Sequence, residues 1–144
     1  MANETVELMN SFLRGEISAV ETYRQALDKI DNPGATRSLL QQCMQSHQQR
    51  VDTLRTQVQR LGGSPAEGSG PWGAFAKLVE GGAKLFGEKA AIAALEEGED
   101  HGRDDYRRDV AKLAGEARTF VTTSIMPEQE RTHRALSDLK RSLS

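Results

Sequence analysis

Apolar residues recur at alternating intervals of three and four positions along most of the chain. This spacing buries one stripe of an amphipathic helix. From about Thr5 to Ile30, the stripe consists of Met9, Leu13, Val20, Tyr23, Leu27 and Ile30. A half-buried strand would instead alternate apolar and polar residues one by one, and we find no convincing run of that kind. The sequence therefore predicts an all-α fold built from long helices.

Proline and glycine divide the chain into four such stretches. The predicted helices run from about Thr5 to Ile30, Thr36 to Leu61, Ala74 to Leu113 and Ala117 to Leu143. Pro127 should bend the last helix or mark its true start. Because only the connection over residues 62–74 is long, we expect a four-helix bundle of two antiparallel hairpins, 5–61 and 75–143. The long crossover would let the third helix run parallel to the second, within one domain spanning residues 1–144.

Composition narrows the classes of partner. The net charge is −2 and basic residues are interspersed with acidic ones, so we expect no nucleic-acid partner. No apolar run approaches the roughly 20 residues that cross a bilayer, so we expect no membrane partner. The single cysteine, Cys43, cannot form an internal disulfide and is interpreted as a small core residue. These features favour a cytoplasmic protein, with a homo-oligomer such as a dimer left open.

The chain contains an internal repeat. The segment GEISAVETYRQALDKI from Gly15 aligns with GEDHGRDDYRRDVAKL from Gly98 at an offset of 83 residues. The identical pairs include Gly15/Gly98, Glu16/Glu99, Tyr23/Tyr106, Arg24/Arg107 and Lys29/Lys112. With an offset of 86, His47 falls on His133. At about 1.5 Å per residue, both glutamates lie some 22–24 Å from their hairpin turns, so the repeat predicts one shared level in the bundle.

Several potential metal ligands should meet at that level. They are Glu16, His47, Glu96, Glu99, Glu130 and His133. Glu16 occupies a slot of the apolar stripe, and burying several carboxylates together is costly unless a cation neutralises them. Carboxylate oxygens with imidazole nitrogens suit iron first, with zinc or manganese as alternatives. We therefore expect one or two divalent ions per chain. The alternatives without a metal are that the Glu16 carboxylate reaches solvent at the edge of the bundle and that His47 is a hydrogen-bonded core histidine.

The pattern resembles a known superfamily. One glutamate on the first and third helices, with a Glu-x-x-His pair on the last, resembles the ferritin-like dimetal carboxylate bundles. GEISAVETY is similar to the Glu-x-x-Ala-x-x-x-Tyr motif of rubrerythrins and bacterioferritins. LRGEISAVETYRQAL and the region GSGPWGAFAKLVEGGAKLFG resemble an uncharacterised bacterial family of single-domain ferritin-like proteins. The resemblance implies a metal-binding bundle that acts in metal handling or the oxidative-stress response.

One residue departs from the ferritin-like pattern. Met44 stands where the second helix of that pattern carries a glutamate. A thioether is a poor ligand for hard iron and cannot bridge two metals. Glu96 could compensate, the site could hold a single ion, or it could be an evolutionary remnant. The alternative function is then a non-enzymatic structural or interaction protein. No catalytic residue is assigned, and whether the chain is an enzyme stays open.

Overall fold

The computed structural model describes residues 2–30, 33–68 and 88–143, and every regular element in those ranges is helical. The elements are α1 (Ala2–Lys29), α2 (Ala35–Arg60), α4 (Glu88–Asp109), η1 (Val110–Lys112), α5 (Gly115–Phe120), η2 (Val121–Ile125) and α6 (Met126–Ser142). The all-α prediction is confirmed for the described residues. The predicted start of the third helix near Ala74 lies outside them. No helix in the described ranges has the length and hydropathy required to span a membrane.

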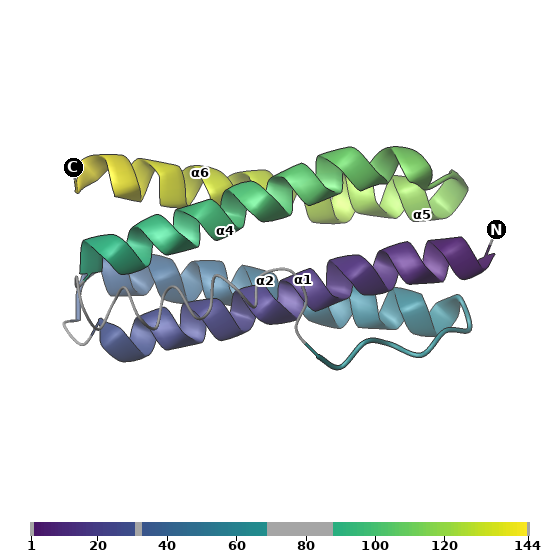
Figure 1. Ribbon diagram of the computed structural model, residues 1–144, viewed down its shortest axis with the longest axis horizontal. Helices are drawn as coiled ribbons and strands as arrows, with labels where there is room; N and C mark the ends of the chain where they lie inside the picture. Colours follow the sequence, from purple (N-terminus) through teal and green to yellow (C-terminus); the bar gives the residue numbers. More distant parts are fainter. Residues whose placement is uncertain (1, 31–32, 69–87, 144) are drawn as a thin grey trace.

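In the described ranges, α1, α2, α4 and the consecutive elements α5, η2 and α6 form the rods of a helical bundle (Figure 1). Helices α1 and α2 make one antiparallel hairpin, and α4 pairs with a composite rod of α5, η2 and α6 to make the other. The chain leaves α2 at one end of the bundle and enters α4 at the opposite end, so α2 and α4 run in the same direction. Within the described residues, this agrees with the two antiparallel hairpins that the loop lengths predicted. The part of the predicted crossover beyond residue 68 lies outside those residues.

The end of α2 is built so that the chain can turn back along α1. Gly62 adopts a φ of 81°, and the backbone N–H of Gly63 donates to the Val58 carbonyl at 2.9 Å. A glycine in a left-handed conformation commonly ends a helix in this way. A side chain at Gly63 would clash with Val6, because its Cβ would lie 2.6 Å from a Val6 methyl group. Asn10 then fixes the connection by donating to the Ser64 carbonyl at 3.0 Å.

The fourth rod is not a uniform α-helix. A five-residue π-helical segment, Val121–Ile125, separates α5 from α6. Pro127 follows in the first turn of α6, where its missing N–H is tolerated. Pro127 therefore lies just inside the start of α6. Because a π turn accommodates one more residue than an α turn, the segment shifts the face that each later residue presents.

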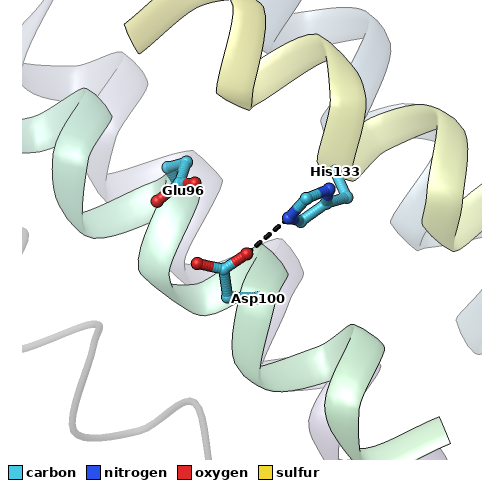
Figure 2. Close-up of side chains that lie close together, drawn as sticks. All are labelled: Glu96, Asp100 and His133. Carbon is cyan, nitrogen blue, oxygen red and sulfur yellow. Dashed lines mark hydrogen bonds and ion pairs between the residues drawn. The ribbon is translucent and has the colours of Figure 1, made fainter. Parts of the chain in front are cut away.

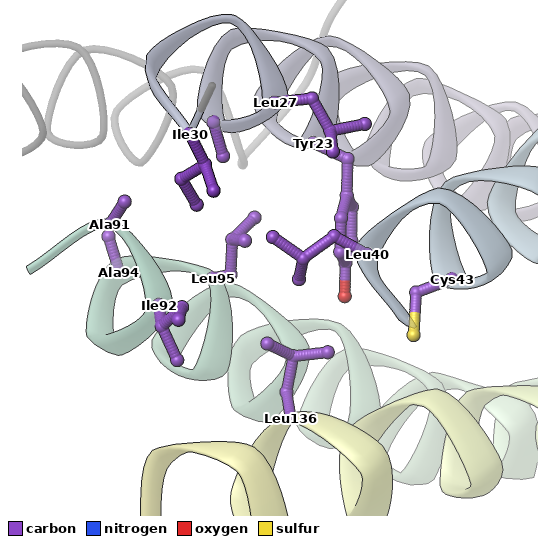
Figure 3. Packing of buried hydrophobic residues seen from close by; sticks show 11 residues of the cluster. Tyr23, Leu27, Ile30, Leu40, Cys43, Ala91, Ile92, Ala94, Leu95 and Leu136 are labelled. Atoms are coloured by element: carbon purple, nitrogen blue, oxygen red, sulfur yellow. The ribbon is translucent and has the colours of Figure 1, made fainter. Parts of the chain in front are cut away.

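Two apolar clusters fill the bundle on either side of a polar layer. One surrounds Tyr23, Leu40, Leu95 and Leu136, all fully buried (Figure 3). The other consists of Met9, Phe12, Leu13, Val20, Val51, Leu54, Val58, Tyr106, Leu113, Val121 and Ile125. Met44 packs against both clusters. Cys43 is buried in the first cluster, which confirms its interpretation as a core residue.

The second apolar cluster makes a stability prediction. Leu54 is fully buried, whereas Leu61, just beyond the end of the same helix, is 37% exposed. Leu54→Ala should lower the free energy of unfolding by about 2–5 kcal/mol because it leaves a cavity. Leu61→Ala should change it by less than about 0.5 kcal/mol. Urea unfolding followed by circular dichroism measures both. Equal losses in the two variants would contradict this packing.

Candidate functional site: a buried ion network and a flanking carboxylate–histidine cluster

The two glutamates of the internal repeat lie together at the centre of the bundle. Glu16 is 3% exposed and Glu99 is fully buried. The Tyr106 hydroxyl donates to Glu16 Oε2 at 2.6 Å, and the Tyr23 hydroxyl donates to Glu99 Oε2. Each tyrosine thus donates a hydrogen bond to the glutamate of the other hairpin. Burial and the adjacent carboxylate raise the pKa of both tyrosines well above 10, so both remain hydroxyl donors.

His47 joins the two glutamates. Its Nδ1 lies 2.5 Å from Glu16 Oε1, and its Nε2 lies 2.8 Å from Glu99 Oε2. Burial and the Arg50 charge lower the pKa of His47, but the two carboxylates outweigh them and raise it above 6.5. An imidazole between two carboxylates satisfies both by carrying a proton on each nitrogen. His47 is therefore a cation in this network.

Arg50 supplies the second positive charge of the core. Its guanidinium group, 2% exposed, donates to Gln129 Oε1 at 2.6 Å, Thr132 Oγ1 at 2.8 Å, Ser46 Oγ at 3.0 Å and Glu16 Oε2 at 3.3 Å. Burial raises the pKa of Glu99, but the positive charges of His47 and Arg50 outweigh it and lower that pKa to about 2. Two buried negative charges are thus balanced by two buried positive ones.

Helix α6 contributes an amide and a hydroxyl to this network. Gln129 Nε2 donates to Glu99 Oε1 at 2.8 Å and to the Glu99 carbonyl at 3.1 Å. Thr132 Oγ1 lies 2.9 Å from Glu99 Oε1 and donates to it. These inward positions precede by one residue the predicted ligands Glu130 and His133. The difference arises because the repeat offset of 86 was set by matching His47 to His133, whereas the apolar stripe from Ile125 to Leu136 places Gln129 and Thr132 inward.

A second cluster of titratable groups lies at the edge of the α4–α6 contact (Figure 2). Glu96 and Asp100 occupy successive turns of α4, and His133 faces them from α6. One ligand atom from each of the three lies within 4.8 Å of the others, and all three residues are partly buried. Asp100 Oδ1 contacts His133 Nε2 directly. Arg103 lies beside both, with its Nη1 3.0 Å from His133 Nε2 and its Nη2 3.6 Å from Asp100 Oδ1.

The six predicted ligands therefore fall into three places. Glu16, His47 and Glu99 meet in the core, as expected, whereas Glu96 and His133 belong to the flanking cluster. Glu130 forms an exposed ion pair with Arg107 at 2.7 Å. The expectation that all six converge at one level is wrong for Glu96, Glu130 and His133. The residues of α6 face one position away from the predicted register, and Glu96 on α4 lies at the edge of the α4–α6 contact. Their roles as metal ligands remain predictions.

Four functional candidates were missed: Arg50, Asp100, Gln129 and Thr132. The sequence held a signal for three of them. Arg50 follows His47 by three residues and so shares its helix face. Gln129 is four residues after Ile125, and Thr132 is four residues before Leu136, so both lie on the stripe that connects those apolar residues. Asp100 is surrounded by charged residues of α4, and we find no signal that would have singled it out.

The sequence matches a family described as a domain of unknown function (DUF2383) over residues 4–112. The chain belongs to this family. The matched region carries Glu16, His47, Arg50 and Glu99 of the core network, whereas α6 lies beyond it. No curated protein and no solved structure matches the chain. Membership of this DUF2383 family therefore assigns no activity, and the function must be argued from the two clusters.

The core network predicts a stability optimum at mildly acidic pH. The pKa of Glu16 and Glu99 is lowered by folding, so their contribution is present above about 4.5 and is lost as the pH falls. The pKa of His47 is raised, so its contribution is present below 6.5 and is lost as the pH rises through the folded value. The free energy of unfolding should therefore be greatest between about pH 4.5 and 6.5.

Urea unfolding from pH 3 to pH 9 tests this profile. His47→Gln should remove the fall on the alkaline side, because the residue that loses its proton there is gone. The control is His101→Gln, since His101 is a partly buried histidine that pairs with Asp105 on its own helix at 3.2 Å. An alkaline fall of unchanged size in His47→Gln would assign it to another group.

Proposed function

We propose that the protein binds a divalent metal ion at the flanking cluster of Glu96, Asp100 and His133. The observation that supports this is the convergence of two carboxylate oxygens and one imidazole nitrogen within 4.8 Å of one another. Three ligands of this kind, on two packed helices, suit zinc, manganese or ferrous iron. Because the residues are only partly buried, water could complete the coordination sphere from the solvent side.

Two basic side chains neutralise the carboxylates of the cluster in this structure. Arg103 now lies against Asp100 and His133, and Lys140 Nζ lies 3.6 Å from Glu96 Oε1. In addition, Ser137 Oγ donates to Glu96 Oε2 at 3.3 Å and so orients that carboxylate. A metal ion would take over the charge neutralisation that the two basic side chains provide. Both are on flexible stems near the surface and can swing into solvent at little cost.

The wider role that we propose is that of a ferritin-like bundle in metal handling or the oxidative-stress response. Support comes from the two hairpins with a long crossover and from the repeated Glu and Tyr positions, which meet at the bundle centre. We take residues 1–144 as one such domain, with iron as the first candidate metal. The alternative is a non-enzymatic structural or interaction protein with a remnant core site. The observation that favours this alternative is Arg50 inside the core.

Metal titration tests the flanking site. Isothermal titration with Zn²⁺, Mn²⁺ or, under nitrogen, Fe²⁺ should show one ion per chain for the unmodified protein. His133→Ala and Asp100→Asn should each raise the dissociation constant by about tenfold or more, because each removes a ligand. Arg103→Gln should lower the dissociation constant, because it removes the competing guanidinium group.

Glu130→Gln is the matched control. It removes a carboxylate from the same helix, three residues before His133, but that carboxylate pairs with Arg107 at the surface. Its dissociation constant should equal that of the unmodified protein. The proposal fails if the unmodified protein binds none of these ions, or if His133→Ala binds them as tightly.

A further inference from the structure

The core network was expected to hold a metal ion, and its donor atoms show whether it fits one. Every carboxylate oxygen of Glu16 and Glu99 has at least one protein donor. Both ring nitrogens of His47 face a carboxylate oxygen. An imidazole binds a metal through a lone pair, and a ring that carries a proton on both nitrogens has no lone pair to offer. His47 is therefore not arranged as a ligand.

The space that an ion would need is taken by Arg50. Its guanidinium group contacts Glu16 from α1, Ser46 from its own helix, and Gln129 and Thr132 from α6. Two of these partners, Gln129 and Thr132, occupy the inward positions of α6 where a Glu-x-x-His pair was expected. An amide oxygen and a hydroxyl are weak metal ligands, but both are good acceptors for a guanidinium group. The residues around Arg50 therefore match arginine better than a metal.

We infer that Arg50 is the resident cation of the bundle core, and that with His47 it replaces the metal ions that the ferritin-like pattern implies. The core of the native protein then binds no metal, and metal binding is confined to the surface. The same inference gives the core a latent site. Without the Arg50 side chain, the carboxylates of Glu16 and Glu99 face a cavity with one positive charge missing. A divalent ion restores the balance when His47 gives up its second proton, which also frees a ring nitrogen to bind the ion.

A small pocket borders this position. It has a volume of about 20 Å³, lies between α1 and α4, and its lining includes Gly15, Glu16, Gly102, Tyr106 and Gln129. That volume is enough for about one water molecule. The pocket therefore leaves room for a species of that size beside Glu16.

The test uses full-length protein in which the flanking cluster has been removed by His133→Ala and Asp100→Asn, so that the surface site cannot contribute. With Arg50 intact, this background should bind neither Zn²⁺ nor Mn²⁺ in titration. Adding Arg50→Ala should create one site per chain. Zn²⁺ at about a hundred times the dissociation constant should then raise the Tm by roughly 5–10 °C over the value in EDTA. A further Glu16→Gln should abolish that rise.

Two results would overturn the inference. One is a core ion in the background that retains Arg50, recognised because Glu16→Gln removes it. The other is a folded Arg50→Ala protein that binds no ion. Failure of the unmodified protein to bind metal at its surface would refute the proposed function and leave the core inference intact, because the core is measured in the background without that site.

Because Arg50→Ala could prevent folding altogether, a second comparison uses Arg50→Met with and without Glu16→Gln, of which the double variant has balanced core charges. Arg50→Met removes the guanidinium charge, and Glu16→Gln removes one carboxylate charge. If Arg50 is the cation that neutralises the core, Arg50→Met with Glu16→Gln should have a higher Tm than Arg50→Met alone. A Tm that falls further on adding Glu16→Gln would contradict the inference. Arg50→Lys, which keeps the charge, should fold and bind no metal in the core.

Discussion

The structure depends on the neutralisation of two carboxylates in the middle of an otherwise apolar bundle. Glu16 and Glu99 come from the two hairpins, and His47 and Arg50 from α2 lie against them. Breaking a buried pair by removing one partner typically costs about 3–5 kcal/mol, because the remaining charge is uncompensated. The network draws on all four rods at one level, because Gln129 and Thr132 of α6 donate to Glu99 as well.

Much of this was readable from the sequence. The three-and-four periodicity gave the helices, loop lengths gave the hairpins, and the offset of 83 residues brought Glu16 and Glu99 together with their tyrosines. These inferences succeeded because an uninterrupted α-helix carries its register over many turns. In the last rod, the match of His47 to His133 at an offset of 86 predicts that Glu130 and His133 face inward. The apolar stripe through Ile125 and Leu136 predicts Gln129 and Thr132 instead, and these two side chains are the buried ones.

The sequence did not indicate which cation lies in the core, and the reason is different. Two buried carboxylates require positive charge beside them, and the sequence correctly predicted that a cation lies in the core. One divalent ion meets this requirement, and so do two singly charged side chains such as Arg50 and protonated His47. Arg50 lies in the polar run QSHQQR, which is typical of a solvated helix face, and only the three-residue spacing from His47 indicates that it points inward. Geometry, rather than composition, distinguishes the two cations.

The core and the flanking cluster are coupled by their position on the same two helices. On α4, Glu99 belongs to the core network and the next residue, Asp100, to the flanking cluster. On α6, Thr132 belongs to the core network and the next residue, His133, to the flanking cluster. The bonds from Gln129 and Thr132 to Glu99 set how far α6 is rotated and shifted against α4. That register places His133 opposite Asp100. The buried network thus orients the surface ligands without contacting an ion, so a change in the core should alter surface binding through geometry alone.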